Sequence, residues 1–110
     1  MIHVVYHREY NRVTVEGHAG SGEQGHDLIC AAVSILALTL ASNVERIAGS
    51  GMAGEPVMIL GEGKAEISCK PRSKYKYATA MVFDTVCEGF ALLAADYPEY
   101  ISYEIRGVRV

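Results

Sequence analysis

The run from Leu28 to Ala41 constrains the fold more than any other part of this sequence, because its only polar side chains are Ser34 and Thr39. A membrane-spanning helix needs about 20 apolar residues, and this run has 14. Asp27, just before the run, is a residue type that favours helix N-caps, and the helical pattern continues to about Ile47. We therefore expect a helix that starts after Asp27 and lies in the middle of a small domain.

Short stretches that are β-branched, aromatic or alternately apolar and polar predict five strands. They are residues 2–7, 13–16, 57–60, 65–69 and 101–105. A second helical pattern spans residues 76–96 and precedes Pro98, which blocks its continuation. Strands joined by short turns favour antiparallel pairing, and apolar helices must cover a sheet face. The order ββαββαβ therefore predicts an α+β two-layer sandwich with a mostly antiparallel sheet.

Length, charge and cysteine content narrow the class of protein. The 110 residues suffice for one domain, so we expect residues 1–110 to form a single domain. A net charge of −3 argues against direct nucleic-acid binding. The three cysteines are widely spaced and form no C-x-x-C pair, which suits free thiols in a reducing compartment. With no secretory-signal pattern at the start of the chain, we expect a cytoplasmic protein without a membrane partner.

The segment from residue 17 to residue 26 is rich in glycine, with Gly17, Gly20, Gly22 and Gly25. Glycine gives the backbone freedom and leaves few side chains to pack. The spacing does not match the G-x-x-x-x-G-K-[ST] pattern of a phosphate-binding loop. We interpret this segment as a flexible loop that closes over a substrate.

Two residues near the ends of this loop are candidates for nucleophilic catalysis. His18 follows the strand 13–16, and Cys30 falls in the predicted first turn of the first helix. The positive end of a helix dipole favours a thiolate, and an imidazole held nearby can take up the thiol proton. The N–H groups of residues 28–30 are candidates for stabilising an oxyanion. Cys30 and His18 are therefore a candidate nucleophile and general base.

Neighbouring residues have more than one interpretation. Asp27 fits a helix cap better than an orienting partner for His18, although both roles are compatible. Ser34, one turn after Cys30, fits a supporting hydrogen-bond residue better than a nucleophile. A cysteine at the start of an apolar helix is usually a small buried hydrophobe. The histidines lack the usual ligand spacing of zinc sites, so we expect no metal. A Cys-His pair needs no organic cofactor, so we expect none.

Two segments resemble the signature of the Prp family of ribosomal-processing cysteine proteases. They are Gly17-His18-Ala19 and, after a short glycine-containing loop, residues 25–34. The family pattern runs G-H-A and then G-x-D-[IV]-[VL]-C-[AS]-[AG]-x-S. Leu28 replaces the more frequent β-branched residue. The run Gly20-Ser21-Gly22 lacks the aromatic or histidine side chain that many members carry there, so a looser loop is expected.

The resemblance implies a bacterial, cytoplasmic, homodimeric endopeptidase that supports ribosome maturation. Such enzymes remove an N-terminal extension from large-subunit ribosomal protein number twenty-seven. The family's nucleophile corresponds to Cys30 and its catalytic histidine to His18, while Asp27 and Ser34 match further motif positions. Two alternatives stay open, namely a non-catalytic ribosome-associated binding module of the same fold and a thiol redox sensor at Cys30.

Overall fold

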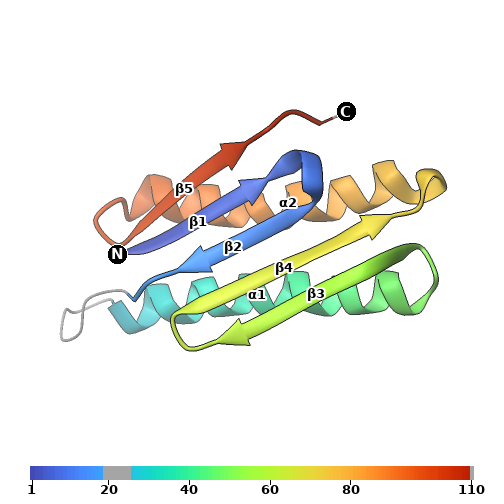
Figure 1. The fold of residues 1–110 in the computed structure, drawn as a ribbon. Helices are drawn as coiled ribbons and strands as arrows, with labels where there is room; N and C mark the ends of the chain where they lie inside the picture. The colour runs from blue at the N-terminus through green and yellow to red at the C-terminus, as the bar shows by residue number, and fades with distance from the viewer. Residues whose placement is uncertain (19–25, 110) are drawn as a thin grey trace.

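The structure, a computed structural model, describes residues 1–18 and 26–109 (Figure 1). The strands are β1 (Ile2–His7), β2 (Arg12–Glu16), β3 (Ala53–Gly61), β4 (Lys64–Pro71) and β5 (Ile101–Arg106). The helices are α1 (His26–Gly49) and α2 (Lys76–Asp96). Two short 3-10 turns, Arg8–Tyr10 and Ser73–Tyr75, complete the described elements.

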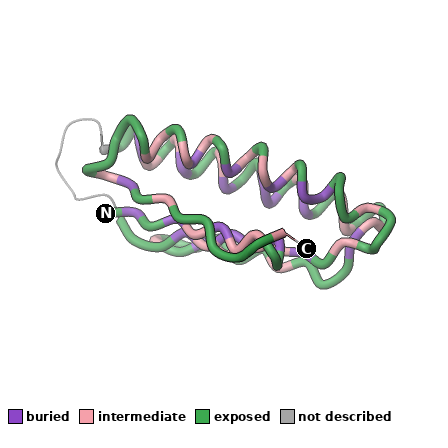
Figure 2. Tube along the Cα trace, turned by 90° about the horizontal axis from the view of Figure 1, so that it is seen from above, coloured by how far each residue is buried: buried purple, intermediate pink, exposed green. Residues whose placement is uncertain are grey.

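One five-stranded sheet and one layer of two helices form the domain (Figures 1 and 2). The strand order is β3-β4-β2-β1-β5, and neighbours pair antiparallel except β1 with β5. Each helix links two strands that run in the same direction, β2 to β3 and β4 to β5, as a crossover connection requires. The predicted order ββαββαβ and the predicted α+β sandwich are confirmed, and the sheet is mostly antiparallel as expected.

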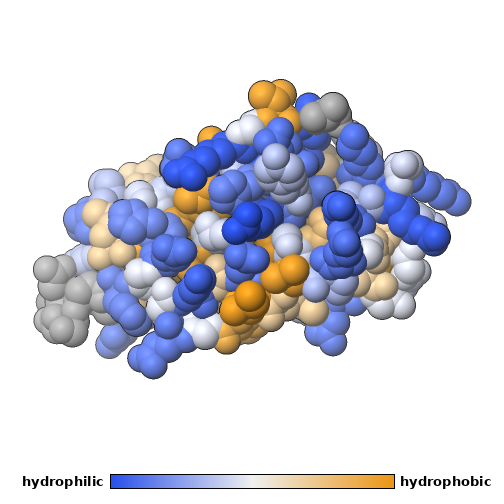
Figure 3. Space-filling view, in the orientation of Figure 1, coloured by the Kyte–Doolittle hydropathy of each residue, from blue (hydrophilic) through white to orange (hydrophobic). Residues whose placement is uncertain are grey.

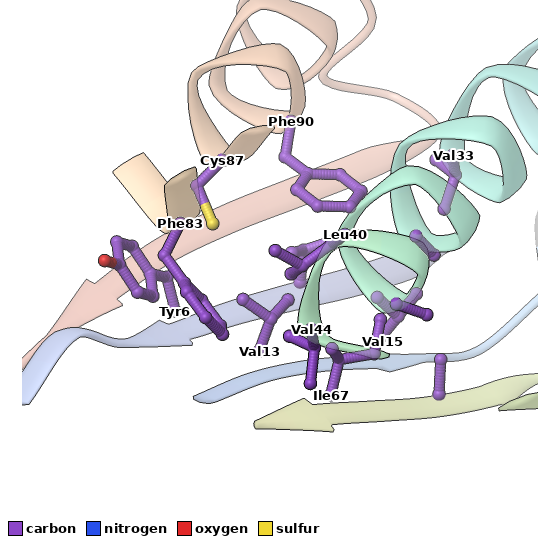
Figure 4. Packing of buried hydrophobic residues seen from close by; sticks show 14 of the residues in the cluster. Tyr6, Val13, Val15, Val33, Leu40, Val44, Ile67, Phe83, Cys87 and Phe90 are labelled. Carbon is purple, nitrogen blue, oxygen red and sulfur yellow. The ribbon is translucent and has the colours of Figure 1, made fainter. Parts of the chain in front are cut away.

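The core lies between the sheet and the helices. Along β1, buried residues alternate with more exposed ones, so that Ile2, Val4 and Tyr6 face the helices. Figure 4 shows aromatic side chains of α2 and aliphatic side chains of α1 meeting over β1, β2 and β4. The largest fully buried side chains are Tyr6, Phe83, Phe90, Leu40, Ile67 and Ile101. This apolar interface is what holds the two layers together.

The opposite face of the sheet has no helix over it in Figures 1 and 2, and it is mostly hydrophilic in Figure 3. Polar and charged side chains alternate there with the buried ones, as in a sheet that is solvated on one side. Arg12 on β2, for example, forms an ion pair of 3.1 Å with Glu66 on β4. Ile59 on the edge strand β3 is an exception, since half of its surface is exposed.

Both helices are long and apolar. By length and composition alone, two helical segments could cross a membrane, namely Asp27–Gly49 and Ser73–Asp96, and about a third of an apolar 18-residue stretch in each is buried in the structure. The first helix was expected from Leu28 to about Ile47, and α1 extends about two residues further at each end, from His26 to Gly49. The buried faces of both helices nonetheless supply much of the core against the sheet.

Several predicted boundaries shift in the structure. The helix α2 coincides with the predicted range, whereas β3 begins at Ala53, four residues earlier than expected. The helix α1 begins at His26, so Asp27 lies inside its first turn rather than before it. The predicted N-cap position of Asp27 is therefore wrong. Its carboxylate still stands near the positive end of the helix dipole, where an anion is favoured.

Candidate active site

A cavity of about 270 Å³ lies where the first part of α1, the end of β2 and the β3–β4 hairpin meet. Both His18 and Cys30 line it, so the structure brings together the two residues that the sequence proposed as a pair. Its other lining residues are Ile2, Val15, Gly17, Val33, Ser34, Ala37, Leu38, Leu60, Gly63, Lys64 and Ala65. Most of these are apolar, and cavities of this kind bind ligands through apolar walls and a few polar groups.

Cys30 differs from the other two cysteines in its accessibility. It is partly exposed, whereas Cys69 and Cys87 are buried. Burial raises the pKa of the Cys69 thiol to about 11 and that of the Cys87 thiol to about 12. Both buried thiols are therefore protonated at neutral pH and poor nucleophiles. Cys30 is the cysteine placed to react with a molecule in the cavity.

The start of α1 changes one detail of the predicted site. Because the helix begins at His26, Cys30 is its fifth residue and lies in the second turn. The backbone N–H groups that lack intrahelical partners are those of the first turn, up to Leu28. The expectation that the N–H groups of residues 28–30 are all available as oxyanion donors is therefore wrong for Ile29 and Cys30.

The main chain around His18 is fixed by hydrogen bonds on both sides. The N-terminal ammonium of Met1 donates to the carbonyl oxygen of His18 at 2.7 Å. The N–H of Gly17 donates to the carbonyl oxygen of Gly63 at 3.0 Å. A Cβ on Gly17 would lie 2.3 Å from the Met1 carbonyl oxygen, so only glycine fits between these partners. Gly17 also has a φ of 106°, a conformation that L side chains rarely adopt.

These contacts correct the interpretation of Gly17 as the first residue of a flexible loop, because it is held against Met1 and Gly63. The other three glycines assigned to that loop, Gly20, Gly22 and Gly25, lie outside the described residues. The predicted closure of this loop over a substrate therefore stays a prediction.

The two supporting residues occupy different places. Ser34 lines the cavity from α1, one helical turn beyond Cys30. Asp27 is exposed in the first turn of α1 and is not among the described residues that line the cavity. Within the described parts of the chain, no group of three or more histidine, cysteine or acidic side chains could hold a metal ion.

The β3–β4 hairpin supplies site residues that the sequence did not reveal. Leu60, Gly63 and Lys64 line the cavity together with the end of β2. The run Gly61–Gly63 predicted a turn, but nothing in it indicated that β4 would pair with β2 and bring this turn to His18. The contact arises because Glu16 pairs with Lys64 in the sheet.

A larger hollow of about 820 Å³ lies at the far end of the β3–β4 hairpin. It contains charged residues of both signs, including Arg12, Glu55 and Lys70, and no histidine among the described residues that line it. Its one cysteine is Cys69, whose raised pKa keeps it protonated. The smaller cavity is therefore the better candidate for nucleophilic chemistry, despite its size.

Comparison with known proteins identifies the family. The family described as "Cysteine protease Prp" matches residues 1–102. The chain belongs to this family. It is therefore a cysteine protease, and the resemblance inferred from the sequence motif is confirmed. No curated protein matches the chain.

Solved structures share the fold of this Prp family member. SMU.848 from Streptococcus mutans is 28% identical, with a TM-score of 0.69, over 94% of this chain and 90% of the other. Prp from Staphylococcus aureus, an essential ribosomal processing protease solved with a covalently linked product peptide, is 23% identical with a TM-score of 0.69. That similarity covers 96% of this chain and all of the other. The match extends over the whole ββαββαβ domain.

Proposed function

We propose that this protease removes the N-terminal extension of large-subunit ribosomal protein number twenty-seven by a Cys-His mechanism. The observation that carries the proposal is that His18 and Cys30 line one mostly apolar cavity. It is supported by the family match and by the S. aureus relative, which is a ribosomal processing protease with a covalently linked product peptide. An apolar cavity of this size suits a hydrophobic side chain next to the cleaved bond.

In the proposed reaction, the Cys30 thiol transfers its proton to His18 and the sulfur attacks the carbonyl carbon of the substrate. The tetrahedral intermediate collapses to a thioester as His18 donates the proton to the leaving amine. Water, deprotonated by His18, then hydrolyses the thioester and releases Cys30. Spare N–H groups of the first turn of α1 are the candidate donors to the oxyanion. The steps need neither metal nor organic cofactor.

Ser34 and Asp27 support this pair in the proposal. Ser34 lines the cavity and is placed to hydrogen-bond within it. Asp27 contributes its negative charge near the start of α1, where it stabilises the helix that carries Cys30. An orienting contact of Asp27 with His18 stays a prediction. Gly20, Gly22 and Gly25 keep their proposed role in a flexible substrate loop, and Gly17 becomes the fixed end of that loop.

The test is cleavage of a fluorogenic peptide that spans the extension of the host's own ribosomal protein. We expect the wild-type protein to cleave it, and Cys30→Ala and His18→Ala to abolish cleavage while circular dichroism shows an unchanged fold. Cys69→Ala and His3→Ala are the matched controls, because Cys69 is buried and His3 hydrogen-bonds to Ser102, away from the cavity. Both controls should retain cleavage.

Two results would overturn the proposal. Cleavage that survives in Cys30→Ala or His18→Ala would exclude the Cys-His mechanism. A folded wild-type protein that cleaves no peptide with the extension sequence would exclude the substrate. In that case a binding role, without cleavage, becomes the better explanation. Reversible oxidation of Cys30 that does not depend on His18 would instead favour the redox sensor.

We also propose that the protein is a cytoplasmic homodimer. The support is apolar surface on the helix layer, where Leu28, Ile35 and Leu92 are each more than 60% exposed. Leu28 and Ile35 are seven residues apart on α1 and so share one face of the helix, and a contiguous exposed apolar face is typical of an interface. We expect light scattering after size exclusion to give twice the 11.9 kDa chain mass, and Ile35→Asp to give a monomer. A wild-type monomer at micromolar concentration would contradict this proposal.

A further inference from the structure

The turn of the β3–β4 hairpin lies against the main chain and the side chain of His18. Gly63 is the residue of this turn that makes the contact. Its carbonyl oxygen accepts the hydrogen bond from Gly17, the residue before His18, at 3.0 Å. Its φ is 73°, a conformation that favours glycine at this position of a tight turn.

The imidazole of His18 occupies the space that a side chain at residue 63 would need. A Cβ on Gly63 would lie 2.5 Å from Nε2 and 2.7 Å from Cε1 of His18. Real Cβ atoms essentially never come this close to other atoms. The main chain at His18 is tied to Met1 and the preceding residue to Gly63, so the backbone there is restrained. The imidazole is therefore the part that must move if residue 63 gains a side chain.

We propose that Gly63 is a positioning residue for His18. Its missing side chain lets the imidazole rest on the hairpin turn at the edge of the cavity that Cys30 also lines. This inference rests on the proposed function, in which His18 exchanges protons with Cys30. Displacing a catalytic group by about 1 Å can lower a rate by about 100-fold. Even one methyl group at residue 63 therefore lowers kcat, while the apolar side chains that line the cavity, such as Val33, Leu38 and Leu60, stay in place.

The chain offers a matched control for the backbone effect of such a substitution. Gly51 has a φ of 76°, close to the 73° of Gly63, but a Cβ on Gly51 meets no atom within 4 Å. Gly63→Ala and Gly51→Ala therefore share the strain of a positive φ. They differ in the contact with His18. Their comparison separates positioning of the imidazole from the general cost of replacing a turn glycine.

The experiment measures urea denaturation, kcat and KM for both variants, and the ring resonances of His18 by NMR, identified by their loss in His18→Gln. We expect both variants to lose stability to a similar degree. Gly63→Ala alone should lower kcat by about 100-fold with a KM within about 3-fold of wild type. It alone should shift the His18 ring resonances. A kcat and His18 resonances equal to those of Gly51→Ala would overturn the inference.

A measurement on the wild-type protein covers the case in which Gly63→Ala does not fold. The contact predicts a nuclear Overhauser effect between the Hα protons of Gly63 and the ring protons of His18. Absence of this effect would overturn the inference without any variant. Failure of the proposed function has a different signature, because either the wild-type protein would then cleave no extension peptide or His18→Gln would retain full cleavage. Loss of cleavage in His18→Gln together with full cleavage in Gly63→Ala would refute the positioning role alone.

Discussion

Two leucines of α1, Leu40 and Leu38, test which face of this helix holds the fold together and which face serves the cavity. Leu40 is fully buried in the core, and Leu38 is 51% exposed and lines the cavity. Truncating either one to alanine changes the intrinsic helix propensity equally. Any difference in stability or activity between Leu40→Ala and Leu38→Ala therefore reflects how deeply each side chain is buried and whether it faces the core or the cavity.

The expected loss of stability follows from burial. Leu40→Ala removes a fully buried side chain and leaves a cavity, which costs about 3 kcal/mol or more. An unfolding entropy of about 2.1 cal/mol/K per residue gives about 0.23 kcal/mol/K for 110 residues, so Tm falls by about 13 °C. Leu38 is half exposed, so Leu38→Ala costs about 1 kcal/mol and lowers Tm by about 4 °C.

The expected effect on activity has the opposite order. Leu38→Ala removes apolar contact with a substrate in the cavity, and a loss of about 1 kcal/mol lowers kcat/KM about 5-fold. Leu40→Ala leaves the cavity walls in place. A domain of this size has a stability of about 5–15 kcal/mol, so this variant stays folded at 25 °C with kcat/KM near wild type.

The assay combines thermal unfolding followed by circular dichroism with peptide cleavage at 25 °C. The reasoning is refuted if both leucines lower Tm equally, because α1 would then not present one face to the core. It is also refuted if Leu40→Ala lowers kcat/KM more than Leu38→Ala does, because the cavity would then not lie where the structure has it.

Three further predictions follow from single features. Gly17→Ala places a Cβ 2.3 Å from a backbone oxygen at a φ of 106°. We expect urea denaturation to show a loss of about 2 kcal/mol or more in the free energy of unfolding. Gly54→Ala is the control, because a Cβ on Gly54 meets no atom within 4 Å, and it should lose less than half as much. The folded-state pKa values of Cys69 and Cys87 are raised to about 11 and 12 from 9.0, so their contribution to stability is full below pH 9 and is lost as pH rises through those values. The urea midpoint should therefore fall steadily above pH 9, and a midpoint that rises there would contradict the burial of these thiols. Iodoacetamide should modify Cys30 alone in the native protein and all three cysteines in urea, and mass spectrometry after limited proteolysis distinguishes the sites.

Much of the fold is encoded locally, and the sequence predicted that part. Alternation marks the last strand as 101–105, one residue short of β5, and helical spacing followed by Pro98 marks α2 correctly. The antiparallel pairs β1–β2 and β3–β4 were also predicted, but the pairing of strands that are not joined by a short turn depends on where the helices cross the sheet. No local pattern indicates that β4 inserts next to β2 or that β5 pairs parallel with β1.

The same limit separates the residues of the site that were predicted from those that were not. His18 and Cys30 lie on one short segment, so a motif and a helix start were enough to suggest them. Gly63 lies 45 residues after His18 and reaches it only through the pairing of β2 with β4. Helix ends are also poorly defined by sequence, which is why Asp27 moved from the cap into the first turn and Cys30 from the first turn into the second.

Main-chain contacts restrain the backbone at His18, the proposed base of this site. The N-terminal ammonium of Met1 donates to the carbonyl oxygen of His18, and the N–H of Gly17 donates to the carbonyl oxygen of Gly63. Cys30 is carried by a 24-residue helix whose far half is packed in the core. In the proposed mechanism, both reacting groups therefore lie on elements whose positions are set by contacts outside the glycine-rich segment. Substitutions in that segment should therefore alter KM more than the reactivity of Cys30, whereas substitutions at Gly17 or Gly63 should alter kcat.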